Sequence, residues 1–222
     1  MVDLRARQSP ILDQGRRGTC VACAATGGHE MVRDDDKSLC VEFLHWGAKG
    51  RDGLPAASEG TTLAAAAAAL AILGQPPEAG WPYDEWRDQW ASGYEPPAGV
   101  REEALQRRLA SGAAIAPTAA DLRASLDGGH APLLGVTIHG TWYAPDPNGR
   151  IAMPTQGATA YGGHAVLVVG YQVGEGAGGG RFIVRNSWGD SWGNKGYGYL
   201  PFDYVTDHGV AAWELGNPVA TP

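Results

Sequence analysis

The chain has 222 residues, of which 44% are hydrophobic and 18% are charged, and its formal net charge is −7. That length allows one domain with a sizeable core, or two small lobes. The acidic balance argues against a nucleic-acid-binding protein, which needs a basic face, and gives no reason to expect attraction to an anionic membrane. The longest apolar run, from Leu63 to Leu73, is too short to span a bilayer.

Cysteine content and the N-terminal sequence bear on the cellular compartment. The three cysteines, Cys20, Cys23 and Cys40, cannot form a disulfide framework, which fits a reducing compartment. The opening "MVDLRARQSP" lacks the basic and then apolar segments of a secretory leader. We therefore expect a cytoplasmic protein, or a secreted one only if a leader has been removed.

The N-terminal half predicts helices. The first helix follows Thr19 as its N-cap, although the pair Gly27-Gly28 weakens its middle. An alanine-rich helix follows Thr61 or Thr62, either of which is a suitable cap. The predicted helices span residues 20–32, 38–49, 63–73, 101–110 and 118–129.

The C-terminal half predicts strands, because its apolar runs are rich in β-branched and aromatic residues and are bounded by glycine. The predicted strands span residues 131–139, 163–174, 181–189, 196–205 and 209–215. Helices followed by antiparallel strands indicate an α+β fold, here with two lobes and a cleft between them. We expect one domain over 1–222, with a helical lobe at 10–112, a β-rich lobe at 113–215 and an N-terminal segment that packs on the β lobe.

The stretch "LDQGRRGTCVACAA" raises the question of chemistry, because C-x-x-C can be a dithiol redox pair, half a metal site or a catalytic thiol beside a second cysteine. A thiol nucleophile needs a lowered pKa, an imidazole within reach and donors aimed at the oxyanion. Cys20 lies at the start of a predicted helix, where unpaired amides and the helix dipole favour an anion. The catalytic interpretation therefore depends on finding the other two groups.

Those groups are present elsewhere in the chain. Gln14 lies on the loop before the Cys20 helix, where its side-chain amide could donate to an oxyanion together with the Cys20 backbone N–H. His164 stands in "YGGHAVLVVGY" at the start of a hydrophobic strand. Asn186 opens "NSWGDSWG", and its amide could fix the imidazole tautomer while Trp188 shields that hydrogen bond from water.

These segments, in this order, resemble the papain (C1) family of cysteine proteases over nearly the whole chain. His164 lies 144 positions after Cys20 and Asn186 lies 166 after it, against roughly 130–150 in that family. The resemblance implies a two-lobed fold with a helical N-terminal lobe and an antiparallel, β-barrel-like C-terminal lobe. It implies cysteine endopeptidase activity with Cys20, His164 and Asn186 as catalytic residues and Gln14 in the oxyanion hole. The residues that it implies for substrate binding are Gly60, Val136, Ala165, Trp188 and Trp192.

Three positions depart from the family pattern. Arg17 stands where many members have a disulfide cysteine, Val21 where they have tryptophan after the nucleophile, and Gly163 where they have aspartate or asparagine before the histidine. With these differences the chain resembles the disulfide-free bacterial branch rather than the secreted lysosomal one. A catalytically inactive papain-like binding module is therefore an alternative, although such proteins usually lose one of the three catalytic residues.

Two further alternative functions would also use Cys20 as a reactive thiol. An acyl-transferring peptide ligase or maturation protease would pass the acyl group to an amine, and a Cys20–Cys23 dithiol would make the protein an oxidoreductase. Cys23 and Cys40 are more simply interpreted as inert core thiols. The sequence has no paired ligands at zinc-site spacing, so we expect no metal and no cofactor. Expected partners are a peptide or protein substrate and an inhibitor or regulatory protein, with the chain itself a monomer.

Overall fold

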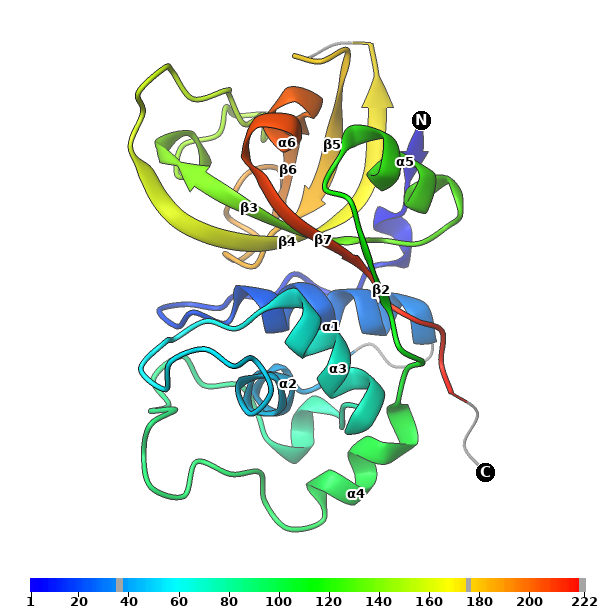
Figure 1. Cartoon of the computed structure of the whole chain (residues 1–222), viewed down its shortest axis with the longest axis vertical. Coiled ribbons are helices and arrows are strands. Elements are labelled where there is room, and N and C mark those ends of the chain that lie inside the picture. The colour runs from blue at the N-terminus through cyan, green and yellow to red at the C-terminus, as the bar shows by residue number, and fades with distance from the viewer. Residues whose placement is uncertain (35–37, 175–176, 220–222) are drawn as a thin grey trace.

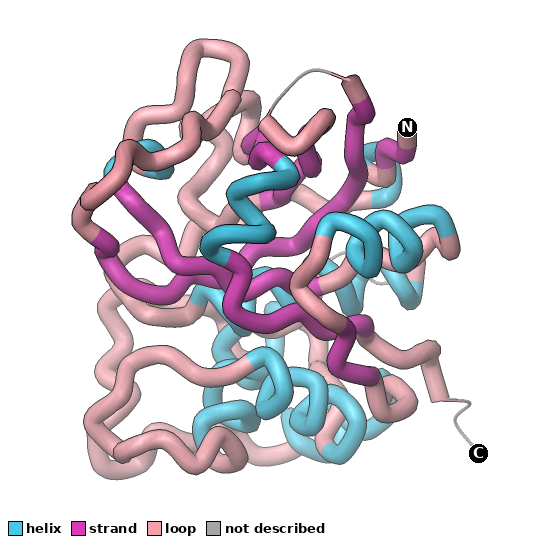
Figure 2. The backbone as a smooth tube through the Cα atoms, turned by 45° about the horizontal axis from the view of Figure 1, so that its top comes forward, coloured by secondary structure: helices cyan, strands magenta, loops and turns pink. Residues whose placement is uncertain are grey.

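The computed structural model describes residues 1–34, 38–174 and 177–219. Figure 1 shows a helical lobe below a lobe built on a curved sheet, with helix α1 (Cys20–Arg33) running along the boundary between them. The backbone view in Figure 2 shows that the strands gather in the upper half and most helices in the lower half. The predicted α+β fold with two lobes is confirmed.

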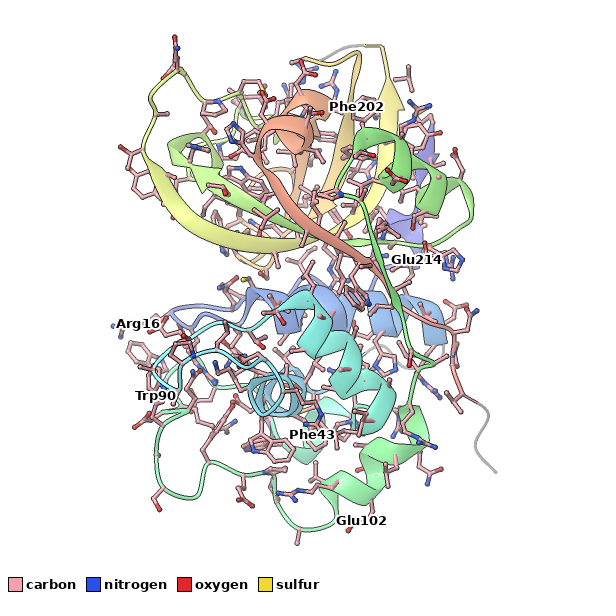
Figure 3. All side chains as sticks on the ribbon, viewed as in Figure 1. Arg16, Phe43, Trp90, Glu102, Phe202 and Glu214 are labelled. Carbon is pink, nitrogen blue, oxygen red and sulfur yellow. The ribbon has the colours of Figure 1, made fainter. Side chains whose placement is uncertain are left out.

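The helical lobe contains α1, α2 (Val41–Lys49), α3 (Leu63–Ile72) and α4 (Val100–Ala104). Thr62 is the N-cap of α3, and its hydroxyl accepts the Ala65 N–H at 3.1 Å, as the sequence predicts. Cys40 is the N-cap of α2, and its sulfur accepts the Phe43 N–H at 3.2 Å. Phe43 itself points into the middle of this lobe (Figure 3).

Helix α1 is continuous through Gly27-Gly28, and the two glycines are the places where the sheet lobe packs against it. A Cβ at Gly27 would lie 3.0 Å from Nη1 of Arg185, and one at Gly28 would lie 2.9 Å from Cδ1 of Leu215. Glycine lowers the stability of a helix, but a larger residue at either position would hold the two lobes apart.

The sheet lobe contains seven described strands, and all their pairings are antiparallel. They are β1 (Val2–Asp3), β2 (Ala113–Ile115), β3 (Leu133–His139), β4 (Ala160–Val173), β5 (Gly180–Arg185), β6 (Tyr197–Pro201) and β7 (Gly209–Glu214). Their order is β2-β7-β3-β4-β5-β6, and β1 pairs with β4, which places the N-terminal strand on the sheet lobe. Two helices, α5 (Ala119–Asp127) and α6 (Phe202–His208), pack on this sheet (Figure 1).

Strand β4 is buried on both faces, which explains its unbroken apolar run. Leu167 and Val169 belong to the core between the lobes, whereas Val166 and Val168 belong to the core inside the sheet lobe. Because successive side chains of a strand point to opposite faces, one strand serves both cores. His164 lies at the start of this buried run.

The predicted strand over 196–205 is wrong in its second half. Strand β6 ends at Pro201 and α6 follows at once, because a helix places Phe202 and Val205 on one face, where both are buried. The ring of Phe202 lies 4.7 Å from that of Phe182 in the upper lobe of Figure 3.

Other predicted elements are shorter in the structure. Helix α4 ends at Ala104 and a 3₁₀ helix over Leu105–Arg107 follows it. The chain then leaves the helix, and the Leu109 N–H donates to the Leu70 carbonyl of α3 at 3.2 Å. The strand predicted over 181–189 stops at Arg185, just before Asn186. In the described part of the chain, no helix has the length and apolar character needed to cross a membrane.

Candidate active site

Cys20 is the first residue of α1, and its half-buried side chain faces the sheet lobe at β4. Burial raises the pKa of its thiol, while hydrogen bonds with the backbone of Ala165, Val21 and Cys20 itself act in the opposite direction. The Ala165 contact places the sulfur beside the residue that follows His164. Folding thus brings together the predicted nucleophile and the predicted histidine from the two lobes.

Asn186 holds the imidazole of His164 in one tautomer. Its Oδ1 lies 2.7 Å from His164 Nε2 and also accepts the backbone N–H of Ser187 at 2.9 Å. A backbone N–H can only donate, so the shared atom of Asn186 is the amide oxygen, and Nε2 must carry a hydrogen. The other ring nitrogen of neutral His164, Nδ1, is therefore free to act as a base.

Aromatic rings surround this pair. The ring of Trp188 lies 4.8 Å from the imidazole of His164 and that of Trp142 lies 5.7 Å from it, edge-on. Burial lowers the pKa of His164 to about 4, although the hydrogen bond to Asn186 acts in the opposite direction. Trp192 lies behind them, 5.8 Å from Trp188, and is only 9% exposed.

Gln14 is fixed by contacts at both ends of its side chain. Its Nε2 donates to the carbonyl of Arg17 at 2.9 Å, and its Oε1 accepts the hydroxyl of Ser187 at 2.7 Å. Its backbone N–H also donates to the Ser187 carbonyl at 2.8 Å. Ser187 has no predicted role, although its place directly after Asn186 in the sequence signals that it lies at the site.

Arg17 connects the loop that carries Gln14 to helix α2. Its guanidinium makes two hydrogen bonds to the carboxylate of Glu42, at 2.7 and 2.9 Å, and both side chains are buried. Arg87 lies 3.0 Å from the same carboxylate, and the hydroxyl of Tyr94 donates to it. Arg17 stands where many members of the family that the sequence resembles have a disulfide cysteine, and here it forms a buried ion pair instead.

Thr19 is the residue before α1 but does not cap it with its side chain, contrary to the sequence prediction. Its hydroxyl lies 2.8 Å from that of Tyr83, which also donates to the carbonyl of Gln14 at 2.7 Å. Tyr83 therefore ties the start of α1 to the Gln14 loop. Because Tyr83 gives its only hydroxyl hydrogen to Gln14, the Thr19 hydroxyl donates in its contact with Tyr83.

A cavity of about 300 Å³ lies between the lobes and is lined by both Cys20 and His164. Three residues that the resemblance implies for substrate binding, Gly60, Val136 and Ala165, also line it. Trp188 and Trp192 do not belong to this lining, since they pack around the imidazole instead. The sequence analysis missed the remaining lining residues, which are Val21, Thr61, Thr62, Leu63, Gly135, Gly163, Val210 and Ala211.

The segment at Gly60 is held from the helical lobe. The ammonium of Lys49 donates to the Gly60 carbonyl at 3.0 Å, and the amide of Gln89 donates to the Glu59 carbonyl at 3.2 Å. Gln89 is in turn bonded to the buried His45 at 2.8 Å. A Cβ at Gly60 would contact only the Gly18 carbonyl, at 3.6 Å, so the glycine leaves its backbone open on the cavity side.

The other two cysteines lack the features of reactive thiols. Burial raises the pKa of Cys23 and of Cys40 to about 12, so both stay neutral near pH 7. All three cysteines are free. Within residues 1–34, 38–174 and 177–219, no group of His, Cys, Asp or Glu side chains is arranged to hold a metal ion. The arrangement thus favours Cys20 as a single nucleophile over a Cys20–Cys23 dithiol.

Comparison with known proteins agrees with this geometry. The profile of the papain family cysteine proteases matches residues 149–211. The chain is 25% identical over 228 residues to an uncharacterized peptidase C1-like protein of Acanthamoeba polyphaga mimivirus, across 94% of this chain and 71% of that protein. Its structure is similar to that of xylellain, a cysteine protease from Xylella fastidiosa, with a TM-score of 0.85 and 26% identity over 97% of this chain and 85% of the other. The sequence of residues 149–211 and the fold of the chain are similar to those of papain-like cysteine peptidases.

More distant similarities are consistent with that family. Mouse cathepsin K is 62% identical over 37 residues, which are 17% of this chain and 11% of that protein. The clostridial cysteine protease Cwp84 has the same fold, with a TM-score of 0.78 and 17% identity over 98% of this chain and 57% of the other. The papain-like peptidase is therefore a hydrolase with peptide or protein substrates, as the sequence predicts.

The ion pair of Arg17 and Glu42 gives a stability prediction. Arg17→Ala leaves the buried carboxylate of Glu42 without its main partner and should lower the free energy of unfolding by about 3–5 kcal/mol. The double variant Arg17→Met with Glu42→Leu removes both charges and should recover most of that loss. Urea unfolding measures both.

Arg16→Ala is the matched control, because Arg16 is exposed at the surface (Figure 3). Its guanidinium lies over the ring of Trp86, which is also exposed. It should change the unfolding free energy by less than about 1 kcal/mol. An Arg17→Ala protein as stable as the Arg16→Ala control would show that the buried pair does not hold the loop.

Proposed function

We propose that the peptidase cleaves peptide bonds through a Cys20–His164–Asn186 mechanism with an acyl-enzyme intermediate. The observation that carries the proposal is the Asn186 oxygen shared between His164 Nε2 and the Ser187 N–H. It leaves Nδ1 as the basic nitrogen of an imidazole that lines the same cavity as Cys20. An inactive binding module would have no need of that tautomer.

The reactive state is a thiolate and imidazolium pair. Burial opposes each charge taken alone, since it raises the pKa of Cys20 and lowers that of His164 to about 4. Transfer of the proton from sulfur to Nδ1 creates both charges at once, and their attraction is stronger in a less polar environment than in water. The backbone hydrogen bonds at the sulfur and the N-terminal end of α1 stabilise the thiolate further.

Gln14 supplies the side-chain donor of the oxyanion hole. One hydrogen of its amide is used by the Arg17 carbonyl, which leaves the second for an oxyanion formed at Cys20. The Ser187 hydroxyl on Oε1 fixes which end of the amide carries the hydrogens. The donor is thus oriented before the substrate arrives, which is how such groups stabilise developing charge.

The reaction then follows from these positions. The Cys20 thiolate attacks the peptide carbonyl, and the oxyanion accepts hydrogen bonds from Gln14 and the Cys20 backbone N–H. His164 gives its proton to the leaving amine and afterwards takes one from water. The water oxygen bonds to the acyl carbon, the C–S bond breaks, and the thiolate and imidazolium pair is restored. The cavity lined by Val136, Ala165 and Val210 accepts an apolar side chain from the acyl half of the substrate.

The first prediction concerns the nucleophile. Cys20→Ala should lose cleavage of a peptide library completely while keeping its fold, because no other described thiol lies in the cavity. Cys23→Ala is the matched control, one helical turn away, and should keep activity. Mass spectrometry of the products gives both activity and specificity. Wild-type rates in the Cys20→Ala protein would rule out the mechanism.

The second prediction concerns pH. If the ion pair exists, iodoacetamide should alkylate Cys20 rapidly already at pH 6, because the imidazolium keeps the sulfur ionised. In His164→Gln, which keeps an amide to donate to Asn186, no imidazolium faces the thiol. Burial then outweighs the backbone hydrogen bonds, so the pKa of Cys20 lies above its usual value of 9.0. Alkylation of that variant should therefore rise only above pH 9. A wild-type profile with that same late rise would show a neutral resting site.

The third prediction concerns the oxyanion hole. Gln14→Ala removes the donor and should lower kcat by about 10²–10³ with a smaller change in KM, since the contact forms only as charge develops. Iodoacetamide labelling of Cys20 creates no oxyanion, so its rate should stay near that of the wild type. Equal losses in labelling and in hydrolysis would instead indicate that Gln14 only holds the loop in place.

A further inference from the structure

Beyond the cavity, a second apolar surface begins at the imidazole of His164. Trp188 packs on His164, and the ring of Tyr143 stacks on Trp188 with centroids 5.3 Å apart and an interplanar angle of 5°. Tyr161 meets the Tyr143 ring edge-on at 5.5 Å. We call Trp188, Tyr143 and Tyr161 the aromatic shelf.

The outer part of the aromatic shelf is open to solvent. Tyr143 is 57% exposed and Tyr161 is 61% exposed, which is unusual for two aromatic rings in mutual contact. The inner part is fixed, because Trp142 and Trp192 stack behind it and the Trp192 indole donates to the Trp142 carbonyl at 2.8 Å. A rigid base with exposed rings at its edge is what an aromatic binding surface requires.

Two glycines leave room beside the shelf. Gly162 and Gly163 separate Tyr161 from His164, and apart from the neighbouring residues in the chain a Cβ at either would meet no heavy atom within 4 Å. Gly163 also lines the cavity beside Cys20. The strand that leads to His164 therefore carries no side chain that would fill the space between the imidazole and Tyr161.

The position of the aromatic shelf relative to the reacting groups identifies what it binds. The cavity beside Cys20 and His164 takes the acyl half of the substrate in the proposed function, and none of the three shelf residues lines it. The other half of the substrate leaves with the amine that His164 protonates, so it must pass the imidazole and the ring of Trp188 that packs on it.

We propose that the aromatic shelf binds the side chain of the residue that follows the scissile bond and selects an aromatic one. The exposed faces and edges of Tyr143 and Tyr161 offer the offset and edge-on contacts that aromatic side chains prefer. An incoming amine that attacks the acyl-enzyme occupies the same place, since its attack reverses the departure of the leaving amine. This inference rests on the acyl-enzyme of the proposed function.

The test uses the second half of the reaction. A peptide methyl ester, whose leaving group is too small to reach the shelf, forms the acyl-enzyme, which then partitions between water and an added amino-acid amide. The amine nitrogen bonds to the acyl carbon, the C–S bond to Cys20 breaks, and the amine proton passes through His164 to the sulfur. Chromatography of the products gives the ratio of aminolysis to hydrolysis for phenylalaninamide, leucinamide, glycinamide and argininamide.

In the wild type, phenylalaninamide should capture the acyl group about three- to tenfold more efficiently than leucinamide, the range that an aromatic contact supplies. The double variant Tyr143→Ser with Tyr161→Ser should lose this preference and keep the methyl ester hydrolysis rate. Trp86→Ser removes an exposed aromatic ring elsewhere and should keep both.

Other outcomes are equally clear. Equal capture of phenylalaninamide and glycinamide by the wild type, or a preference for argininamide, would overturn the assignment of the shelf to aromatic side chains. A preference for phenylalaninamide that survives in the double variant would place its origin outside the shelf. Absence of any methyl ester hydrolysis would instead refute the acyl-enzyme, and with it the proposed function.

Discussion

The packing of α1 against β4 is the contact on which the site depends. Cys20 comes from the helical lobe and His164 and Asn186 come from the sheet lobe, so no reactive arrangement exists in either lobe alone. Gly27 and Gly28 let the sheet lobe approach α1 closely, and the apolar core between the lobes holds that approach. The distance between the proposed nucleophile and the proposed base is thus set by core packing, which tolerates little displacement.

Polar contacts hold the loop that carries Gln14 against both lobes. The isolated bridge between Asp13 and Trp188 and the bond from Ser187 to Gln14 tie the Gln14 loop to the sheet lobe. Arg17 ties the same loop to α2 through Glu42. The loop is therefore fixed to both lobes without a covalent link, which suits a chain whose three cysteines are all free. Because Arg17 and Glu42 are both buried, loss of either one would leave the other as an unpaired buried charge.

Burial at the site acts on two properties at once. It disfavours a lone charge on Cys20 or on His164, and it strengthens the attraction between the two charges when both are present. The aromatic rings that exclude water from the His164–Asn186 bond extend outward as the aromatic shelf. One group of rings thus packs around the proposed base and forms the surface that we propose for the leaving half of the substrate.

The sequence by itself determined the α+β order of elements, the cap of α3, and the four residues proposed for catalysis, because each is encoded in a local pattern of a few neighbouring residues. It misplaced the end of β6, since the buried face of α6 becomes visible only when the core is present. Only the tertiary structure decided the tautomer of His164, the partner of Arg17 and the orientation of Gln14. The physical reason is separation along the chain: Ser187 lies 173 positions from the Gln14 that it orients, and Glu42 lies 25 positions from Arg17. Such contacts depend on how the lobes pack, and no local pattern records them.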